Sequence, residues 1–159
     1  MRDIGFDYYW YDDFTQNLLA RGFEMQTEHG MYELLTAFEV FEHLVNPKVE
    51  VEKMLSKSDN ILLSTIILSE AIPQTSWWYY GFEHGQPISF YSENTLQTLA
   101  SHFGMHFYPF NNLFLMTKRK FNYQKLIFIF NTARYGLYYL VKLRMKSLTE
   151  VDNRTIGKS

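Results

Sequence analysis

The segment YELLTAFEVFEHL, Tyr32 to Leu44, decides the fold class of this 159-residue chain. A largely apolar run from Tyr32 to Phe38 is followed by two carboxylates and a histidine. A short apolar run of this kind is typical of a strand that is covered on both faces. The segment therefore predicts a buried strand, a polar turn at its carboxyl end and the start of a helix.

Strand and helix patterns alternate on both sides of this segment. Ser92 reads as the N-cap of one helix, and Pro47 suits the first turn of another. Alternation of this kind predicts an α/β fold with a mostly parallel, doubly wound sheet and helices on both faces. The predicted strands lie near residues 8–11, 32–37 and 60–67, and the predicted helices cover Phe14–Arg21, Val49–Ser56, Ser92–Phe103 and Gln124–Lys146.

Two apolar segments close the predicted sheet. Met105–Phe110 and Leu113–Lys118 are joined by Asn111-Asn112, a good turn for a hairpin. We therefore expect a hairpin at roughly residues 105–118, with one antiparallel strand near the edge of the sheet.

Composition excludes several classes of protein. Apolar residues make up 47% of the chain and there is no cysteine, so disulfides and thiolate metal sites are excluded. No run of about 18 apolar residues and no signal peptide is recognisable, and we expect a cytoplasmic protein. The net charge is −2, but Lys118 to Lys146 contains eight Lys or Arg and no acid. That stretch could face phosphate, an anionic membrane or an acidic partner.

Four segments occur in a characteristic order: YWYDD, YELLTAFEVFEHL, NILLSTIIL and ISFYSENTLQTLASHFGMHFY. Together they resemble a class I S-adenosylmethionine-dependent methyltransferase of a small bacterial subgroup. The resemblance covers roughly Asp3 to Lys118. It implies a Rossmann-like sheet, S-adenosyl-L-methionine as cofactor and a partial methyltransferase domain at residues 1–120. Residues 121–159 would then form a basic, aromatic helix and a polar tail.

The resemblance assigns the cofactor to residues that follow predicted strands. Asp12 matches the family's acid that binds the adenosyl ribose, and an acid at a strand's carboxyl end can accept both ribose hydroxyls. Asp13 takes this role if the register slips by one, and both acids could instead cap the next helix. Phe38 and Glu39 are expected to touch the methionine or ribose portion of the cofactor.

The catalytic candidates are Glu42, His43 and His84. Glu42 and His43 could act as a general base or orient the acceptor, or they could merely favour the start of a helix. His84 lies in an aromatic stretch, with Trp77 to Tyr80, that borders the acceptor pocket in the family. These aromatics could stack on a substrate or form a lid over the core. The spacing of acids and histidines predicts no metal site.

The chain departs from the family at its start. The family's first strand and glycine-rich turn have no counterpart before Met1, so we expect an N-terminally truncated sheet. Relatives carry a histidine where this chain has Pro87.

Two functions follow from the resemblance and from that departure. The first is methyl transfer to a small-molecule or glycan acceptor, an activity that the missing first strand and glycine-rich turn could abolish in this chain. The second is a non-catalytic interaction module that binds a partner or membrane surface through residues 121–146. Binding to nucleic acid is not expected, because the basic stretch lacks the repeated basic and aromatic pattern of a single-strand groove.

Overall fold

The computed structural model describes the whole chain except residues 14, 19–20, 27–29, 69–70, 84 and 157–159. It contains two compact units, Gly30–Leu126 and Met1–His29 with Ile127–Ser159. Each unit is described by itself. The sequence predicts domains at residues 1–120 and 121–159. These bounds describe how far a family domain extends along the chain, and they stay a prediction.

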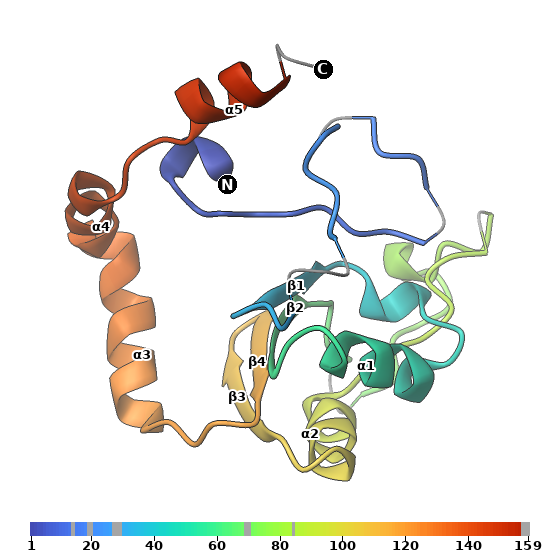
Figure 1. Cartoon of the computed structure of the whole chain (residues 1–159). Helices are drawn as coiled ribbons and strands as arrows, with labels where there is room; N and C mark the ends of the chain where they lie inside the picture. Colours follow the sequence, from blue (N-terminus) through green and yellow to red (C-terminus); the bar gives the residue numbers. More distant parts are fainter. Residues whose placement is uncertain (14, 19–20, 27–29, 69–70, 84, 157–159) are drawn as a thin grey trace. The chain divides into compact units, whose positions relative to one another are not determined.

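The larger unit is built on a four-stranded sheet (Figure 1). Its spatial order is β1-β2-β4-β3, and only the pair β1–β2 is parallel. In the parallel pair Leu35 lies opposite Ile61 and Phe38 opposite Ser64. The strands are β1 (Leu35–Phe38), β2 (Asn60–Ser64), β3 (His106–Phe110) and β4 (Leu113–Thr117).

This topology confirms a mixed α/β fold and corrects the expectation of a mostly parallel sheet. The predicted hairpin forms, with Asn111 at a φ of 56° in its turn. Its second strand, β4, pairs antiparallel with β2, so two of the three strand pairings are antiparallel. The apolar pattern of β2 predicts a buried strand, but it does not reveal the direction of its neighbours.

The predicted strand at residues 8–11 is wrong. Only an isolated bridge between Trp10 and Glu24 forms there among the described residues. Trp10 donates to the Phe23 carbonyl and accepts from the Met25 amide, both at 2.8 Å. Aromatic residues favour extended backbone, but a strand also needs a neighbouring ladder to satisfy its amides. The described part of the predicted helix 14–21, residues 15–18 and 21, is not helical either.

Two helices of the larger unit pack on one face of the sheet (Figure 1). They are α1 (Pro47–Leu55) and α2 (Glu93–His102). Ser92 caps α2 by accepting from the Thr95 amide at 3.1 Å, as its sequence predicts. The core joins both helices to the alternate, inward-facing positions of β1, β2 and β4. Its fully covered members include Phe41, Val51, Ile61, Leu63, Leu96, Phe114 and Met116.

The smaller unit has helices at both ends of the sequence. These are the 3-10 turn η1 (Arg2–Ile4), α4 (Tyr138–Arg144), α5 (Thr149–Ile156) and most of α3 (Tyr123–Thr132), which begins in the larger unit. The segment η5 (Ala133–Leu137) joins α3 to α4 through a kink, where Gly136 has a φ of 134°. The predicted helix 124–146 is therefore helical over most of its length, but bent.

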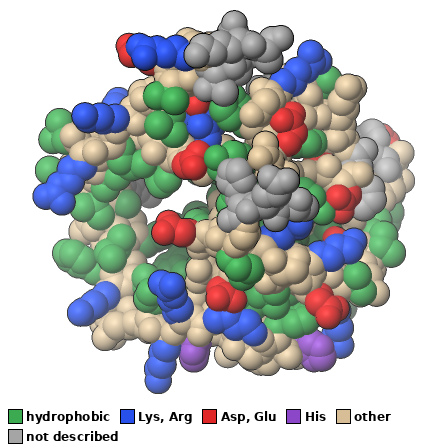
Figure 2. Space-filling view, in the orientation of Figure 1, with side chains coloured by type: hydrophobic (Ala, Val, Ile, Leu, Met, Phe, Trp, Pro, Cys, Tyr) green, Lys and Arg blue, Asp and Glu red, His purple; other side chains and the backbone are tan. Residues whose placement is uncertain are grey.

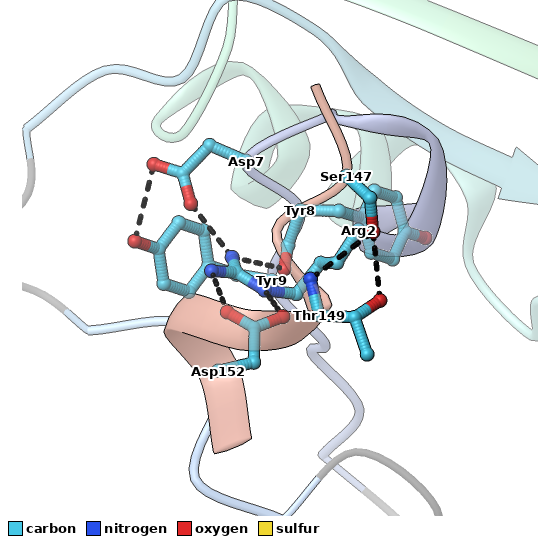
Figure 3. A network of polar contacts seen from close by, with 7 residues as sticks. All are labelled: Arg2, Asp7, Tyr8, Tyr9, Ser147, Thr149 and Asp152. Atoms are coloured by element: carbon cyan, nitrogen blue, oxygen red, sulfur yellow. Dashed lines mark hydrogen bonds and ion pairs between the residues drawn. The ribbon is translucent and has the colours of Figure 1, made fainter. Parts of the chain in front are cut away.

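Arg2 joins the two ends of the chain within the smaller unit (Figure 3). Its guanidinium donates to both carboxylate oxygens of Asp152, at 2.9 and 2.8 Å, and to Asp7 at 2.6 Å. It also lies over the Phe23 ring, 4.3 Å from the centroid. A bidentate guanidinium–carboxylate pair fixes both partners in one plane, so Arg2 orients η1 against α5.

None of the helices formed by the described residues is both long and apolar enough to cross a bilayer.

Candidate functional site

Glu39 stands at the carboxyl end of β1 in a left-handed conformation, with a φ of 52°. Its amide donates to the carbonyl and to the hydroxyl of Ser64, each at 3.1 Å. The Ser64 hydroxyl in turn donates to Glu39 Oε1 at 2.6 Å. These three hydrogen bonds tie the first residue after β1 to the last residue of β2.

The pair lies where parallel strands of an α/β sheet present their carboxyl ends. Ligands of such sheets bind beyond that edge. Phe38, the last residue of β1, is 46% exposed there, and Glu39 is also exposed. The edge therefore presents a carboxylate, a hydroxyl and an aromatic ring, and the contact of Phe38 and Glu39 with a cofactor stays a prediction.

Glu42 is the second carboxylate of the region, and it is buried, with 2% of its surface exposed. It lies in the 3-10 turn η3 (Phe41–His43). The Tyr79 hydroxyl donates to its Oε1 at 3.2 Å. Its other oxygen, Oε2, is buried without a hydrogen bond to any described residue. Buried polar atoms nearly always have a partner, so Oε2 marks a position that can accept a hydrogen bond from a ligand.

The two phenols near Glu42, those of Tyr79 and Tyr91, have raised pKa values. Burial raises the pKa of Tyr79, and the negative charges of Glu42 and Glu39 raise it further, against an opposing effect of the Thr65 hydroxyl. Burial also raises the pKa of Tyr91. Both phenols therefore stay protonated and can act only as neutral hydrogen-bond groups near pH 7.

The turn that carries Glu42 is held by the segment before α2. The amides of Ile88 and Ser89 both donate to the Glu42 carbonyl at 3.0 Å. The Tyr91 hydroxyl donates to the Phe41 carbonyl at 3.1 Å. Backbone and side chain of this segment thus fix the direction of Glu42, while its carboxylate stays available to Tyr79.

Aromatic rings line the same region from residue 77 onward. Trp77 contacts Tyr79 and Tyr80 with ring centroids 5.1 and 5.2 Å apart, and Phe90 contacts all three. Trp78 is 75% exposed. The 3-10 helix η4 (Trp78–Tyr80) therefore has a packed aromatic side and an open one. The packed side fits the alternative of a lid over the core, and the stacking of these rings on a substrate stays a prediction.

The other predicted site residues are His43, His84, Asp12 and Asp13. His43 is exposed on η3, and His84 lies outside the described residues. Asp12 and Asp13 belong to the smaller unit, where Asp12 accepts from the Thr15 hydroxyl at 2.6 Å and Asp13 from Tyr11 at 2.7 Å. Their assignment to the ribose stays a prediction. Across the described ranges, no group of three or more metal-binding side chains occurs.

Sequence reasoning missed two partners of the predicted acids. Ser64 holds Glu39, and Tyr79 holds Glu42. A hydroxyl at the end of the neighbouring parallel strand is the signal for Ser64, because adjacent strand ends meet at one edge. Tyr79 comes from a segment 37 residues away in sequence and has no comparable signal.

Comparison with known proteins gives one match, to a family model that covers the region of this site. Residues 1–107 match a family model described as a methyltransferase domain. Neither a search of curated proteins nor one of solved structures gives a significant match. The match includes β1, β2, α2 and every residue of the site described above.

Proposed function

The chain belongs to the methyltransferase domain family, and we propose that it transfers a methyl group from S-adenosyl-L-methionine to a small-molecule or glycan acceptor. The observation that carries the proposal is a pair of acids that follow β1: Glu39 is exposed and held by Ser64, and Glu42 is buried and bonded to Tyr79. One acid is exposed and suits a cofactor, while the other is buried and suits an acceptor proton.

The residues at the β1–β2 edge fit the chemistry of this cofactor. Its sulfonium is a cation, which carboxylates and aromatic faces both attract. Its ribose offers two hydroxyls, which a carboxylate can bind together. Glu39, fixed by Ser64, would hold the cofactor with the exposed ring of Phe38. When bound, the cofactor supplies an activated methyl group.

Glu42 would serve the acceptor. Its Oε2 is buried and has no partner among the described residues, so it can receive a hydrogen bond from an acceptor hydroxyl or amine. As a carboxylate it can also take the proton that this group loses. Tyr79 keeps the carboxylate oriented through Oε1. Because the methyl donor is already activated, holding the two reactants in line supplies much of the rate.

The test is a calorimetric titration of the full chain with S-adenosyl-L-methionine and its demethylated product. We expect Glu39→Gln to weaken binding by about tenfold or more, since a hydrogen bond to a charged group contributes about 1.5–3 kcal/mol. Ser64→Ala should weaken it less, because it frees the carboxylate without removing it.

The matched control is Glu52→Gln, an exposed acid on α1. It should leave binding unchanged. Equal affinities for the parent chain, Glu39→Gln and Glu52→Gln would contradict the assignment of Glu39. Failure of the parent chain to bind either compound at millimolar concentration would contradict the cofactor.

A further inference from the structure

The helices α3 and α4 expose large apolar side chains on several sides. Neither helix has a buried residue. The most exposed apolar residues of α3, α4 and the kinked segment η5 between them are 51% to 84% exposed. They are too many and too close together to count as the scattered apolar residues of an ordinary surface. These residues, the C-terminal apolar surface, are Phe128, Ile129, Tyr135, Tyr139, Leu140 and Leu143.

The segment that carries this surface is rich in cations and contains no acid. The segment from Lys118 to Lys146 holds eight of the chain's 15 Lys and Arg and none of its 17 Asp and Glu. Lys125, Lys142 and Arg144 are exposed and form no ion pair with any described residue. Figure 2 shows hydrophobic and basic side chains gathered together over α3 and α4.

The combination of exposed apolar residues and cations indicates which kind of partner can bind this surface. A second copy of the chain would bring the same cations face to face, at a cost in repulsion. A protein groove takes one stripe of a helix, at spacings of three and four residues. Here Phe128 and Ile129, and likewise Tyr139 and Leu140, are exposed at successive positions and point in different directions.

The surface of a lipid bilayer can bind the apolar, the aromatic and the basic side chains together. Leu and Phe enter the boundary of the acyl chains, and tyrosines suit the headgroup level. Long basic side chains extend from an apolar helix to anionic headgroups. We propose that residues 123–146 bind the surface of an anionic bilayer without crossing it. The proposal does not depend on methyl transfer.

The experiment is co-sedimentation of the full chain with vesicles. One set contains phosphatidylcholine alone, and the other contains equal parts of phosphatidylcholine and phosphatidylserine. We expect binding to the anionic set at about 0.01 M salt, and much weaker binding at about 1 M, where charges are screened within about 3 Å. Vesicles of phosphatidylcholine alone should bind little protein.

Two variants and a matched control sharpen the test. Lys142→Gln with Arg144→Gln and Lys146→Gln should lower the partition coefficient by about a hundredfold, the effect expected of three charges near an anionic surface. Phe128→Ser with Leu143→Ser should lower it by about tenfold or more. Val45→Ser with Ile72→Ser, two apolar residues of the larger unit that are each 89% exposed, should change nothing.

Three results would overturn the proposal. The first is a parent chain that stays in the supernatant with anionic vesicles at low salt. The second is equal losses in the Phe128/Leu143 and Val45/Ile72 variants. The third is a basic-to-glutamine variant that binds as well as the parent.

Discussion

Each of the two units of this chain is stabilised by a different kind of interaction: apolar burial in one, and ion pairs in the other. The unit Gly30–Leu126 contains every buried residue of the hydrophobic core, from Ala37 to Met116. None of the described residues in the unit formed by the two ends of the chain belongs to that core, and the guanidinium of Arg2 ties its termini together. Apolar burial is cooperative across many residues, whereas an ion pair depends on two. We therefore expect a core substitution in the first unit to destabilise that whole unit, and loss of the ion pairs in the second unit to affect only the residues around them.

Phe114→Ala should give the largest loss of stability. Phe114 is fully buried and stacks on Phe107 with ring centroids 5.7 Å apart. Truncation leaves a cavity, and we expect the free energy of unfolding to fall by about 3–5 kcal/mol in urea denaturation. Phe128→Ala, the same change at a position 69% exposed, should stay within about 0.5 kcal/mol. Comparable losses in both variants would break the contrast between the units.

Tyr79→Phe should come next, with a loss of about 1–3 kcal/mol, because it leaves both oxygens of the buried Glu42 without a partner among the described residues. Thermal unfolding of the parent and the variant measures the difference. Tyr135→Phe provides the control, since that ring is 84% exposed. If the two variants unfold at the same temperature, Tyr79 does not stabilise Glu42.

Arg2→Gln should affect only the smaller unit. Without the guanidinium, α5 loses its bond to η1, and we expect the amides of Asp152 and Leu148, which lie at that junction, to exchange hydrogen at least about tenfold faster. Amides of β2 should keep their rates. Lys48→Gln, an exposed substitution on α1, is the control. Faster exchange in β2 after Arg2→Gln would mean that the two units unfold together.

Acidification should produce the smallest effect, again in the smaller unit. The hydrogen bond from Arg2 lowers the pKa of Asp152 below its ordinary value, which is about 3.9. The stabilisation is therefore complete above about pH 3.9 and is lost as the pH falls through the lower, folded pKa. A carboxyl NMR titration should give Asp152 a depressed midpoint that rises toward 3.9 in Arg2→Gln. An unchanged midpoint would contradict the pairing.

The same contrast explains what could be predicted from sequence. Elements of the larger unit follow local rules: Ser92 caps α2, Pro47 opens α1, and Asn111 takes the left-handed turn of the hairpin. The placement of Glu39 at a strand end follows from the same rules. The direction of β4 does not, because it depends on which neighbour a strand pairs with.

Long-range polar contacts were not predictable at all. Arg2 and Asp152 are separated by 150 positions in sequence, and neither carries a local signal for the other. The strand expected at residues 8–11 failed for a related reason. Its aromatic pattern favours extended backbone, but only Trp10 bridges to another segment there among the described residues.

The left-handed backbone of Glu39 has a consequence for engineering. Such a conformation costs a residue with a side chain about 1–2 kcal/mol, and glycine adopts it freely. The amide bonds to Ser64 would survive the change, because they come from the main chain. A screen that rewards thermal stability would therefore favour glycine at this position. The same screen would discard the carboxylate proposed to hold the cofactor, so selection for robustness and selection for ligand affinity oppose one another at a single residue.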